Sequence, residues 1–201
     1  MNIKNKPVGI ILAAGFGTRL KPMTRYINKH LLPIYNKPMI YYSISLLKKS
    51  KIKNIYIICS KNDHKIYLSI LNTGKEFGLK INYLFQSEND GIAGALKVFR
   101  DNFDINSNRK LVTLLGDNLF FGQGLYEFFI SKALISKNKF SIFCKTHNEP
   151  KNFGVLNIKN NKALEIIEKP KKFISNIIVT GLYVFNSQCL TELDKIKKSE
   201  F

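Results

Sequence analysis

A short apolar run that leads into a glycine-containing loop constrains the fold of this chain more than any other feature. The run Val8-Gly9-Ile10-Ile11-Leu12 is followed at once by Ala-Ala-Gly-Phe-Gly-Thr-Arg-Leu over residues 13–20. A β-branched run bounded by small residues is typical of a central parallel strand. Gly15 and Gly17 allow a tight turn whose N–H groups can face an anion, and Arg19 adds a fixed positive charge. The pattern predicts a buried strand that leads into a phosphate-binding loop.

This loop differs from the two commonest glycine-rich phosphate loops. No Gly-Lys-Ser/Thr follows it, as a P-loop requires, and the third glycine of the dinucleotide fingerprint is missing. The sequence therefore argues against a P-loop kinase and against a dehydrogenase.

Length and composition indicate one folded domain over residues 1–201. The hydrophobic content is 45%, yet no apolar stretch approaches the length of about 18 residues that a membrane span needs. Residues 1–7 are short and polar, unlike a signal peptide, so we expect a cytoplasmic protein without a membrane partner. The three cysteines, Cys59, Cys144 and Cys189, are far apart in the sequence, which favours structural thiols over a disulfide or a zinc site.

The net charge of +18 raises the question of a nucleic-acid partner. Only four of the 32 basic residues are arginines, and the lysines are spread along the chain among asparagine and isoleucine. Nucleic-acid modules usually gather basic side chains on one face with exposed aromatic rings between them. We therefore expect no nucleic-acid partner. A positive field instead favours small polyanions such as nucleotides and sugar phosphates.

Strand-like and helix-like segments alternate over the first two thirds of the chain. The predicted strands there are Val8–Leu12, Ile55–Cys59, Ile81–Phe85 and Leu111–Leu115, and the predicted helices are Pro38–Lys49, Asp63–Leu71, Ile92–Asn102 and Gly124–Ser136. The last third is strand-rich, with Ser141–Lys145, Val155–Ile158, Leu164–Glu168 and Val179–Phe185, and a polar turn over Asn157–Lys162. Together they predict a three-layer α/β/α, Rossmann-like mixed sheet.

Ligands of such sheets bind beyond the carboxyl ends of the strands, where several polar groups are expected. Asp117 follows a strand and could hold Mg²⁺ together with nucleotide phosphates, or could merely cap a turn. Gln86 can pair its amide with a pyrimidine edge, and Gly91 would let the backbone approach a base. Glu168 and Lys169 could bind a sugar phosphate or could form a strand-end ion pair.

A set of motifs in a fixed order gives the chain a family resemblance. They are Gly9–Leu20, Lys29–Tyr42, Gln86–Ala95, Leu115–Gly122, Phe153–Val155, Glu168–Pro170 and Val179–Tyr183. With these segments the chain resembles the sugar-phosphate nucleotidyltransferases over nearly its whole length. The resemblance implies the nucleotide-diphospho-sugar transferase type of fold, with dTTP and glucose-1-phosphate as substrates. It also allows a homo-oligomer, since members often form tetramers.

The family pattern implies roles for individual residues. The catalytic set would be Arg19, Lys29 and Asp117, with Asp117 holding Mg²⁺. The nucleotide would be bound by Leu12, Ala14, Gly15, Gly17, Thr18, His30, Gln86 and Gly91. The sugar phosphate would be bound by Asn118, Gly154, Glu168, Lys169, Val179 and Tyr183.

The chain also departs from that pattern. Ala14-Gly15-Phe16 replaces a usual Gly-Gly-Ser, His30 replaces a glutamine that commonly contacts the nucleotide, and Phe153 replaces a tyrosine. The family's second Mg²⁺-binding aspartate lies in a segment that has no counterpart here, so a domain truncated at its C-terminus is expected. Two alternatives follow: transfer from UTP or CTP, and a noncatalytic nucleotide-sugar binding module.

Overall fold

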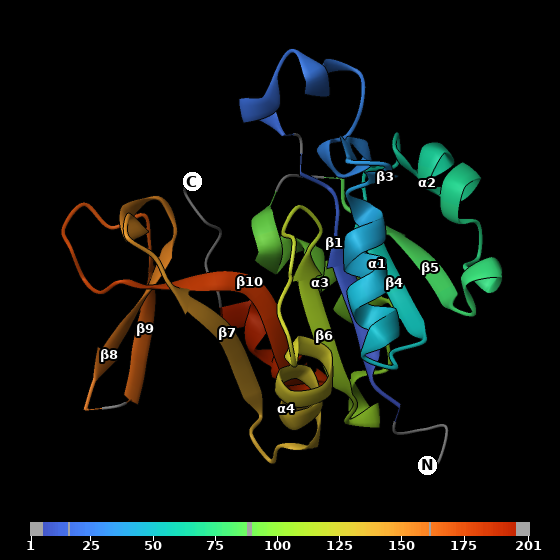
Figure 1. Cartoon of the computed structure of the whole chain (residues 1–201). Coiled ribbons are helices and arrows are strands. Elements are labelled where there is room, and N and C mark those ends of the chain that lie inside the picture. Colours follow the sequence, from blue (N-terminus) through green and yellow to red (C-terminus); the bar gives the residue numbers. More distant parts are fainter. Residues whose placement is uncertain (1–5, 16, 88–89, 161, 196–201) are drawn as a thin grey trace.

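The computed structural model describes residues 6–15, 17–87, 90–160 and 162–195, and its centre is a twisted mixed sheet (Figure 1). In the described part of the chain this sheet has eight strands. Seven follow the order β5 (Lys80–Phe85), β4 (Asn54–Cys59), β1 (Val8–Leu12), β6 (Lys110–Leu115), β10 (Ile177–Asn186), β8 (Gly154–Lys159) and β9 (Lys162–Glu168). The eighth, β7 (Phe140–Thr146), pairs with β10.

Four parallel strands bring their carboxyl ends to one edge. β1 pairs in parallel with β4 and with β6, and β4 pairs in parallel with β5. In this register Leu12 lies beside Ile58 and Leu115. The segments that follow these strands therefore meet at the same edge, where α/β sheets bind ligands.

Antiparallel strands extend the sheet on its other side. β10 runs antiparallel to β6 through its second half, pairs with β7 in both halves, and meets β8 at Ile178 in its first half. The hairpin β8–β9 projects as an arm from this end of the sheet (Figure 1). The arm thus lies next to the carboxyl end of β6, with β10 between them.

Helices cover both faces of the sheet. One core contains α1 (Ile40–Lys49), α2 (His64–Leu71) and α4 (Ser131–Ile135), and the other contains α3 (Gly91–Asp101) and the 3₁₀ segment Ser187–Lys195. Successive β1 side chains alternate between them, with Ile11 in the first core and Ile10 in the second. A Cβ on Gly9 would lie 2.6 Å from Cδ1 of Leu47, so only glycine lets α1 pack this close. The predicted three-layer fold is confirmed.

The predicted elements are confirmed, with shifts at their ends. The helix predicted over Pro38–Lys49 begins at Ile40, because Lys37–Pro38 (β3) pairs with Pro33–Ile34 (β2). The helix predicted over Gly124–Ser136 is a π-helical turn at Leu125–Ile130 followed by α4. The turn predicted over Asn157–Lys162 is shorter, since β8 continues to Lys159 and β9 starts at Lys162.

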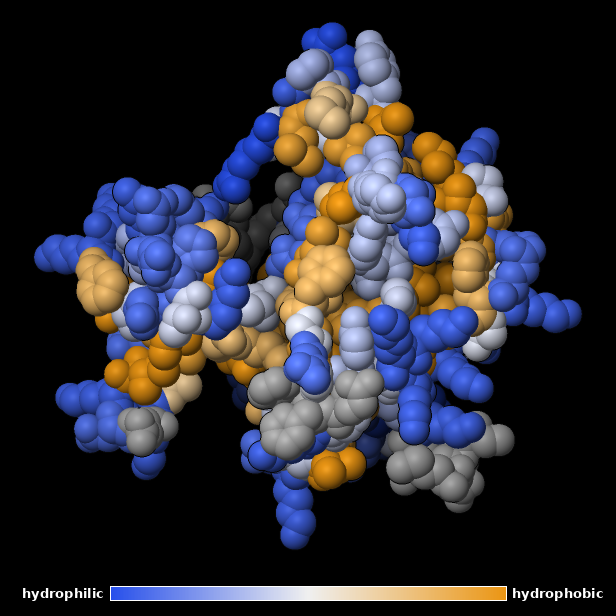
Figure 2. All heavy atoms as spheres, viewed as in Figure 1, coloured by the Kyte–Doolittle hydropathy of each residue, from blue (hydrophilic) through white to orange (hydrophobic). Residues whose placement is uncertain are grey.

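The surface is rich in scattered hydrophilic side chains. Figure 2 shows them projecting from every part of the visible face and not gathered into one patch. No helix among the described residues is long and apolar enough to cross a membrane. The cysteines are free; burial raises the pKa of the Cys59 thiol to about 12, whereas Cys144 is exposed.

Candidate nucleotide and sugar-phosphate site

A cavity of about 190 Å³ lies at the carboxyl edge of the parallel strands. Its lining comes from the ends of β1 and β6, from the turn that carries Lys29, and from the start of α3. It brings together eight of the residues predicted from sequence: Leu12, Ala14, Gly15, Lys29, His30, Gln86, Gly91 and Asp117. Ile92, Ala95 and Leu115 also line it and were not predicted. Their apolar character suits the face of a base, but apolar residues in a helix or at a strand end gave no separate signal in the sequence.

The loop after β1 is anchored by its neighbours. Gly17 adopts a left-handed φ of +60°, and its carbonyl accepts a hydrogen bond of 2.7 Å from Oγ1 of Thr24. Thr18 and Arg19 follow in a short exposed 3₁₀ turn, and Arg19 makes no ion pair with any described residue. Its guanidinium is thus available to an anion from solvent. Phe16 lies outside the described residues.

Gly15 leaves space for a neighbouring side chain to pack beside the loop. Its φ lies outside the left-handed region. A Cβ there would lie 3.2 Å from Cε of Lys29. The glycine therefore leaves room for the Lys29 side chain to pass along the loop toward the cavity.

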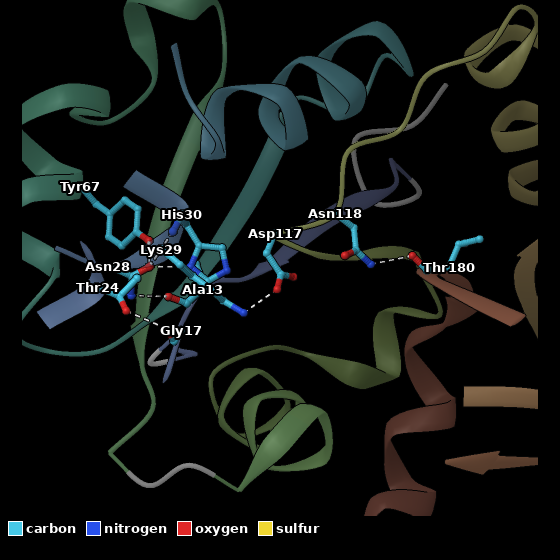
Figure 3. Close-up of polar contacts among 10 residues, drawn as sticks. All are labelled: Ala13, Gly17, Thr24, Asn28, Lys29, His30, Tyr67, Asp117, Asn118 and Thr180. Atoms are coloured by element: carbon cyan, nitrogen blue, oxygen red, sulfur yellow. Dashed lines mark hydrogen bonds and ion pairs between the residues drawn. The ribbon is translucent and has the colours of Figure 1, made fainter. Parts of the chain in front are cut away.

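Lys29 and Asp117 form the charged centre of the site. Lys29 Nζ lies 2.5 Å from Oδ2 of Asp117, although the two residues are far apart in the chain (Figure 3). Burial acts to raise the pKa of the Asp117 carboxyl, but the hydrogen bond and charge of Lys29 outweigh it, and the pKa lies below its usual range. Asp117 is ionised at neutral pH, so the site presents a carboxylate and an ammonium side by side.

The donor set near Asp117 is suited to a metal that also binds phosphate. Among the described residues, no group of three His, Cys, Asp or Glu side chains comes together to hold an ion. Mg²⁺ does not need such a cage, because it is commonly bound by one or two carboxylates with water and substrate phosphates. Lys29 contacts only Oδ2 of Asp117. The residues present therefore fit Mg²⁺ that arrives with a nucleotide.

His30 and Asn28 form a buried polar pair behind this centre. The His30 ring is 1% exposed, and its Nδ1 lies 2.6 Å from Oδ1 of Asn28. Burial, followed by the charge of Lys29, lowers the pKa of His30 to about 4 against the opposite effect of Asp117 and Asp63. The imidazole is neutral at pH 7. Asn28 is not among the residues predicted from the sequence, although an Asn before a 3₁₀ turn is a signal for a capping residue.

Gln86 and Gly91 lie together in the lining of the cavity. The Gln86 side chain is 9% exposed, and its Nε2 donates to the Gly91 carbonyl at 3.3 Å. Gly91 has φ +64° and begins α3. The amide oxygen of Gln86 forms no hydrogen bond with a described residue. The protein thus fixes the Nε2 side of the Gln86 amide, and the amide oxygen remains to accept a hydrogen bond from a ligand.

Five of the six residues predicted to bind the sugar phosphate form a second group, on or directly after strands β8, β9 and β10. Gly154 pairs with Glu168 across the hairpin, and a Cβ on Gly154 would meet Oε2 of Glu168 at 3.1 Å and Cβ of Val179 at 4.0 Å. Burial and the charge of Glu168 raise the pKa of Tyr183, which places its ring near the same carboxylate. Lys169 has φ +43° and an exposed ion pair of 3.8 Å with Glu168. The group lies outside the cavity.

Asn118 connects the two groups. It follows Asp117, and its Nδ2 donates to the Thr180 carbonyl at 2.8 Å (Figure 3). One of its amide N–H groups is therefore used to hold β10 against the end of β6. The other polar atoms of the amide remain for a ligand between the cavity and the arm.

Gly181 makes this connection possible, and replacing it is expected to be costly. It has φ +74° in the irregular part of β10, and a Cβ there would lie 2.6 Å from both Asn118 Nδ2 and Leu115 Cδ1. Gly181→Ala should lower the free energy of unfolding by about 2–4 kcal/mol through strain and overpacking. Gly78→Ala is the control, because Gly78 has φ +67° and open space around it. Gly78→Ala should lower the free energy of unfolding, measured with urea, by about 1 kcal/mol. An equal loss in the two variants would contradict the packing argument.

A three-layer α/β fold with a charged pair in a cavity at its strand ends is typical of proteins that bind nucleotides, and the comparisons identify the family. The chain belongs to the nucleotidyl transferase family, whose model matches residues 8–200. A glucose-1-phosphate thymidylyltransferase from Neisseria meningitidis is 38% identical over 192 residues, which are 95% of this chain and 65% of that protein. One from Mycolicibacterium smegmatis is 35% identical over the same shares. This chain thus spans a little under two thirds of the length of these relatives.

Solved structures agree in fold. A protein from Bacillus anthracis, described as a glucose-1-phosphate thymidylyltransferase in complex with sucrose, superposes with a TM-score of 0.86 at 37% identity, covering 95% of this chain and 76% of that one. A UDP-glucose pyrophosphorylase with UDP-glucose superposes with a TM-score of 0.80 at 20% identity, covering 98% of this chain and 81% of that one. The second likeness concerns the fold alone.

Proposed function

We propose that this chain transfers the thymidylyl group of dTTP to glucose-1-phosphate and so forms dTDP-glucose and pyrophosphate. The observation that carries the proposal is the Lys29–Asp117 pair, set in a cavity between a glycine-containing loop and the Gln86 amide. The names of the relatives favour the same substrates. Residues 1–201 would act as one nucleotidyltransferase domain in the cytoplasm, and assembly into a homo-oligomer belongs to the same proposal.

In the proposed reaction, a phosphate oxygen of glucose-1-phosphate attacks the α-phosphorus of dTTP. A new P–O bond forms as the bond to the bridging oxygen of the β-phosphate breaks, and pyrophosphate leaves. The attacking oxygen is already ionised, so no base has to remove a proton. The protein then contributes position and charge, as phosphoryl transfer generally requires.

Each part of the site has a task in this scheme. The loop N–H groups and Arg19 bind the β- and γ-phosphates, and Lys29 neutralises charge on the transferred group. Asp117 would hold Mg²⁺, which when bound would offset phosphate charge. Gln86 and Gly91 would read the pyrimidine, and the arm group at Glu168 would hold the sugar hydroxyls.

The first test is release of pyrophosphate by the 201-residue chain with glucose-1-phosphate and Mg²⁺, comparing dTTP, UTP, CTP and GTP at equal concentration. Turnover highest with dTTP supports the proposal. Higher turnover with UTP or CTP would contradict the thymidylyl assignment and favour the other pyrimidine. Binding of dTTP without turnover would instead favour a noncatalytic nucleotide-binding module.

A further inference from the structure

A chain of buried hydrogen bonds behind the cavity fixes the roles of its atoms. Nδ2 of Asn28 donates to Oδ2 of Asp63 at 2.8 Å and to the Ala13 carbonyl at 3.3 Å, and Oδ1 accepts from the backbone N–H of His30 at 3.0 Å. A carbonyl accepts only and a backbone N–H donates only, so the orientation of the amide is determined. Oδ1 of Asn28 is therefore an acceptor.

This orientation decides where the proton of the His30 ring lies. Nδ1 of His30 is 2.6 Å from the Asn28 Oδ1 acceptor, so Nδ1 must carry the hydrogen (Figure 3). The hydroxyl of Tyr67 reaches the same oxygen at 3.4 Å, which adds a further donor on that side. In a neutral imidazole the other nitrogen is then an acceptor, so Nε2 offers a lone pair.

The Nε2 acceptor has no protein partner among the described residues, and His30 lines the cavity. Its neighbour is Gly116, where a Cβ would lie 2.8 Å from Cδ2 and 3.2 Å from Nε2 of the ring. Any larger side chain at position 116 would cover this edge of the imidazole. The glycine thus leaves the buried acceptor open toward the ligand space.

We propose that Asn28 is a positioning residue that holds His30 in the Nδ1–H tautomer, so that Nε2 accepts a hydrogen bond from a hydroxyl of the nucleotide sugar. The inference rests on the proposed function for the identity of the nucleotide. In that arrangement His30 lines the same cavity as Lys29, which would bind phosphate, and Gln86, which would bind the base. The sugar of a nucleotide lies between its phosphates and its base, and the free hydroxyl of a deoxyribose can donate a hydrogen bond to an unprotonated imidazole nitrogen.

Asp63 connects this chain of hydrogen bonds to helix α2. It lies at the N-cap of that helix and also accepts from Ser60 Oγ at 2.6 Å. The Nδ2 group of Asn28 thereby donates both to the start of α2, at Asp63, and to the Ala13 carbonyl just after β1. The tautomer is set by the fold before any ligand binds.

The first experiment reads the tautomer directly. In ¹⁵N NMR of the ligand-free protein at pH 7, Nδ1 of His30 should show the signal of a protonated ring nitrogen and Nε2 that of an unprotonated one. Asn28→Ala should abolish this bias. A protonated Nε2 in the wild-type protein would overturn the proposal, whatever the chain binds, so this reading is independent of the proposed function.

The second experiment measures binding of dTTP by calorimetry. Addition of dTTP should shift the Nε2 signal, and Asn28→Ala should weaken dTTP binding about fivefold to tenfold, the effect of one hydrogen bond. In a His30→Phe background Asn28→Ala should have no further effect, because Asn28 acts through His30. Additive losses, or dTTP binding that leaves Nε2 unchanged, would overturn the proposal. Absence of any dTTP binding by the wild type would instead contradict the proposed function.

Asn82→Ala is the matched control for lost stability. Asn82 donates to Asn54 Oδ1 at 2.9 Å and to the Ile55 carbonyl at 3.2 Å, away from the cavity. Like Asn28→Ala, this variant loses two hydrogen bonds donated by an amide Nδ2, but its affinity for dTTP should stay within twofold of the wild type. An equal loss in both variants would mean that Asn28 has only a structural role.

Discussion

The Asp117→Asn variant is expected to lose about a hundredfold to a thousandfold in kcat, the usual effect of removing one preorganised charge contact at a phosphoryl centre. The asparagine keeps the size of the side chain but removes the carboxylate that faces Lys29 and that would bind Mg²⁺. The Asp117 side chain is 34% exposed, so water can replace part of the lost contact. Its melting temperature should therefore remain within a few degrees of the wild type.

The measurement is kcat for pyrophosphate release at saturating substrate and Mg²⁺, with circular dichroism as the check of folding. Asp194→Asn is the control, because it also removes an exposed carboxylate from an ion pair, that with Arg100. Its kcat should change less than twofold. If Asp117→Asn kept most of its turnover, the charged centre would have no part in the reaction. If it unfolded instead, Asp117 would be a turn-capping residue.

The parallel strands of the sheet were predictable from the local sequence pattern. The runs at Val8–Leu12, Ile55–Cys59 and Leu111–Leu115 are buried on both faces, so continuous hydrophobicity alone marks them. The extent of the β8–β9 hairpin was not predictable in this way. β9 is exposed along most of its length, and its polar residues resemble those of a turn. Its ends are set by pairing between strands, which the local sequence does not encode.

In the site too, some features follow from the local sequence, and others follow only from contacts between residues that are distant in the chain. Position after a strand end was enough to place Asp117 and Gln86 in one cavity, because parallel strands end at the same edge. The pair of Lys29 with Asp117 joins residues 88 positions apart, and its contact is visible only in the fold. Asn28 was missed for a different reason. Its role depends on Asp63 from another element, whereas its sequence context indicates no more than a cap.

The buried His30 gives the second large effect, on stability at acid pH. Its pKa is lowered from 6.5 to about 4, first by burial and then by the charge of Lys29, while Asp117 and Asp63 act in the opposite direction. Between these two pH values the unfolded chain takes up a proton that the folded chain does not. The free energy of unfolding therefore falls as the pH drops from 6.5 to 4. The Asp117 carboxyl contributes in a lower window, because its pKa is depressed and its stabilising charge is lost only below its usual range.

We expect the lowered pKa of His30 to reduce the free energy of unfolding by about 3 kcal/mol as the pH falls from 6.5 to 4, since one pKa unit corresponds to about 1.4 kcal/mol. Urea unfolding at intervals from pH 7 to pH 4 measures the slope. His30→Gln cannot take up this proton, so its free energy of unfolding should fall less steeply with pH than that of the wild type, even if the substitution lowers stability at pH 7. His147→Gln is the control, because that ring lies against Phe153, outside the cavity, and it should leave the slope unchanged. A wild-type slope in His30→Gln would show that another group causes the acid sensitivity, and the neutral buried imidazole would then have to be abandoned.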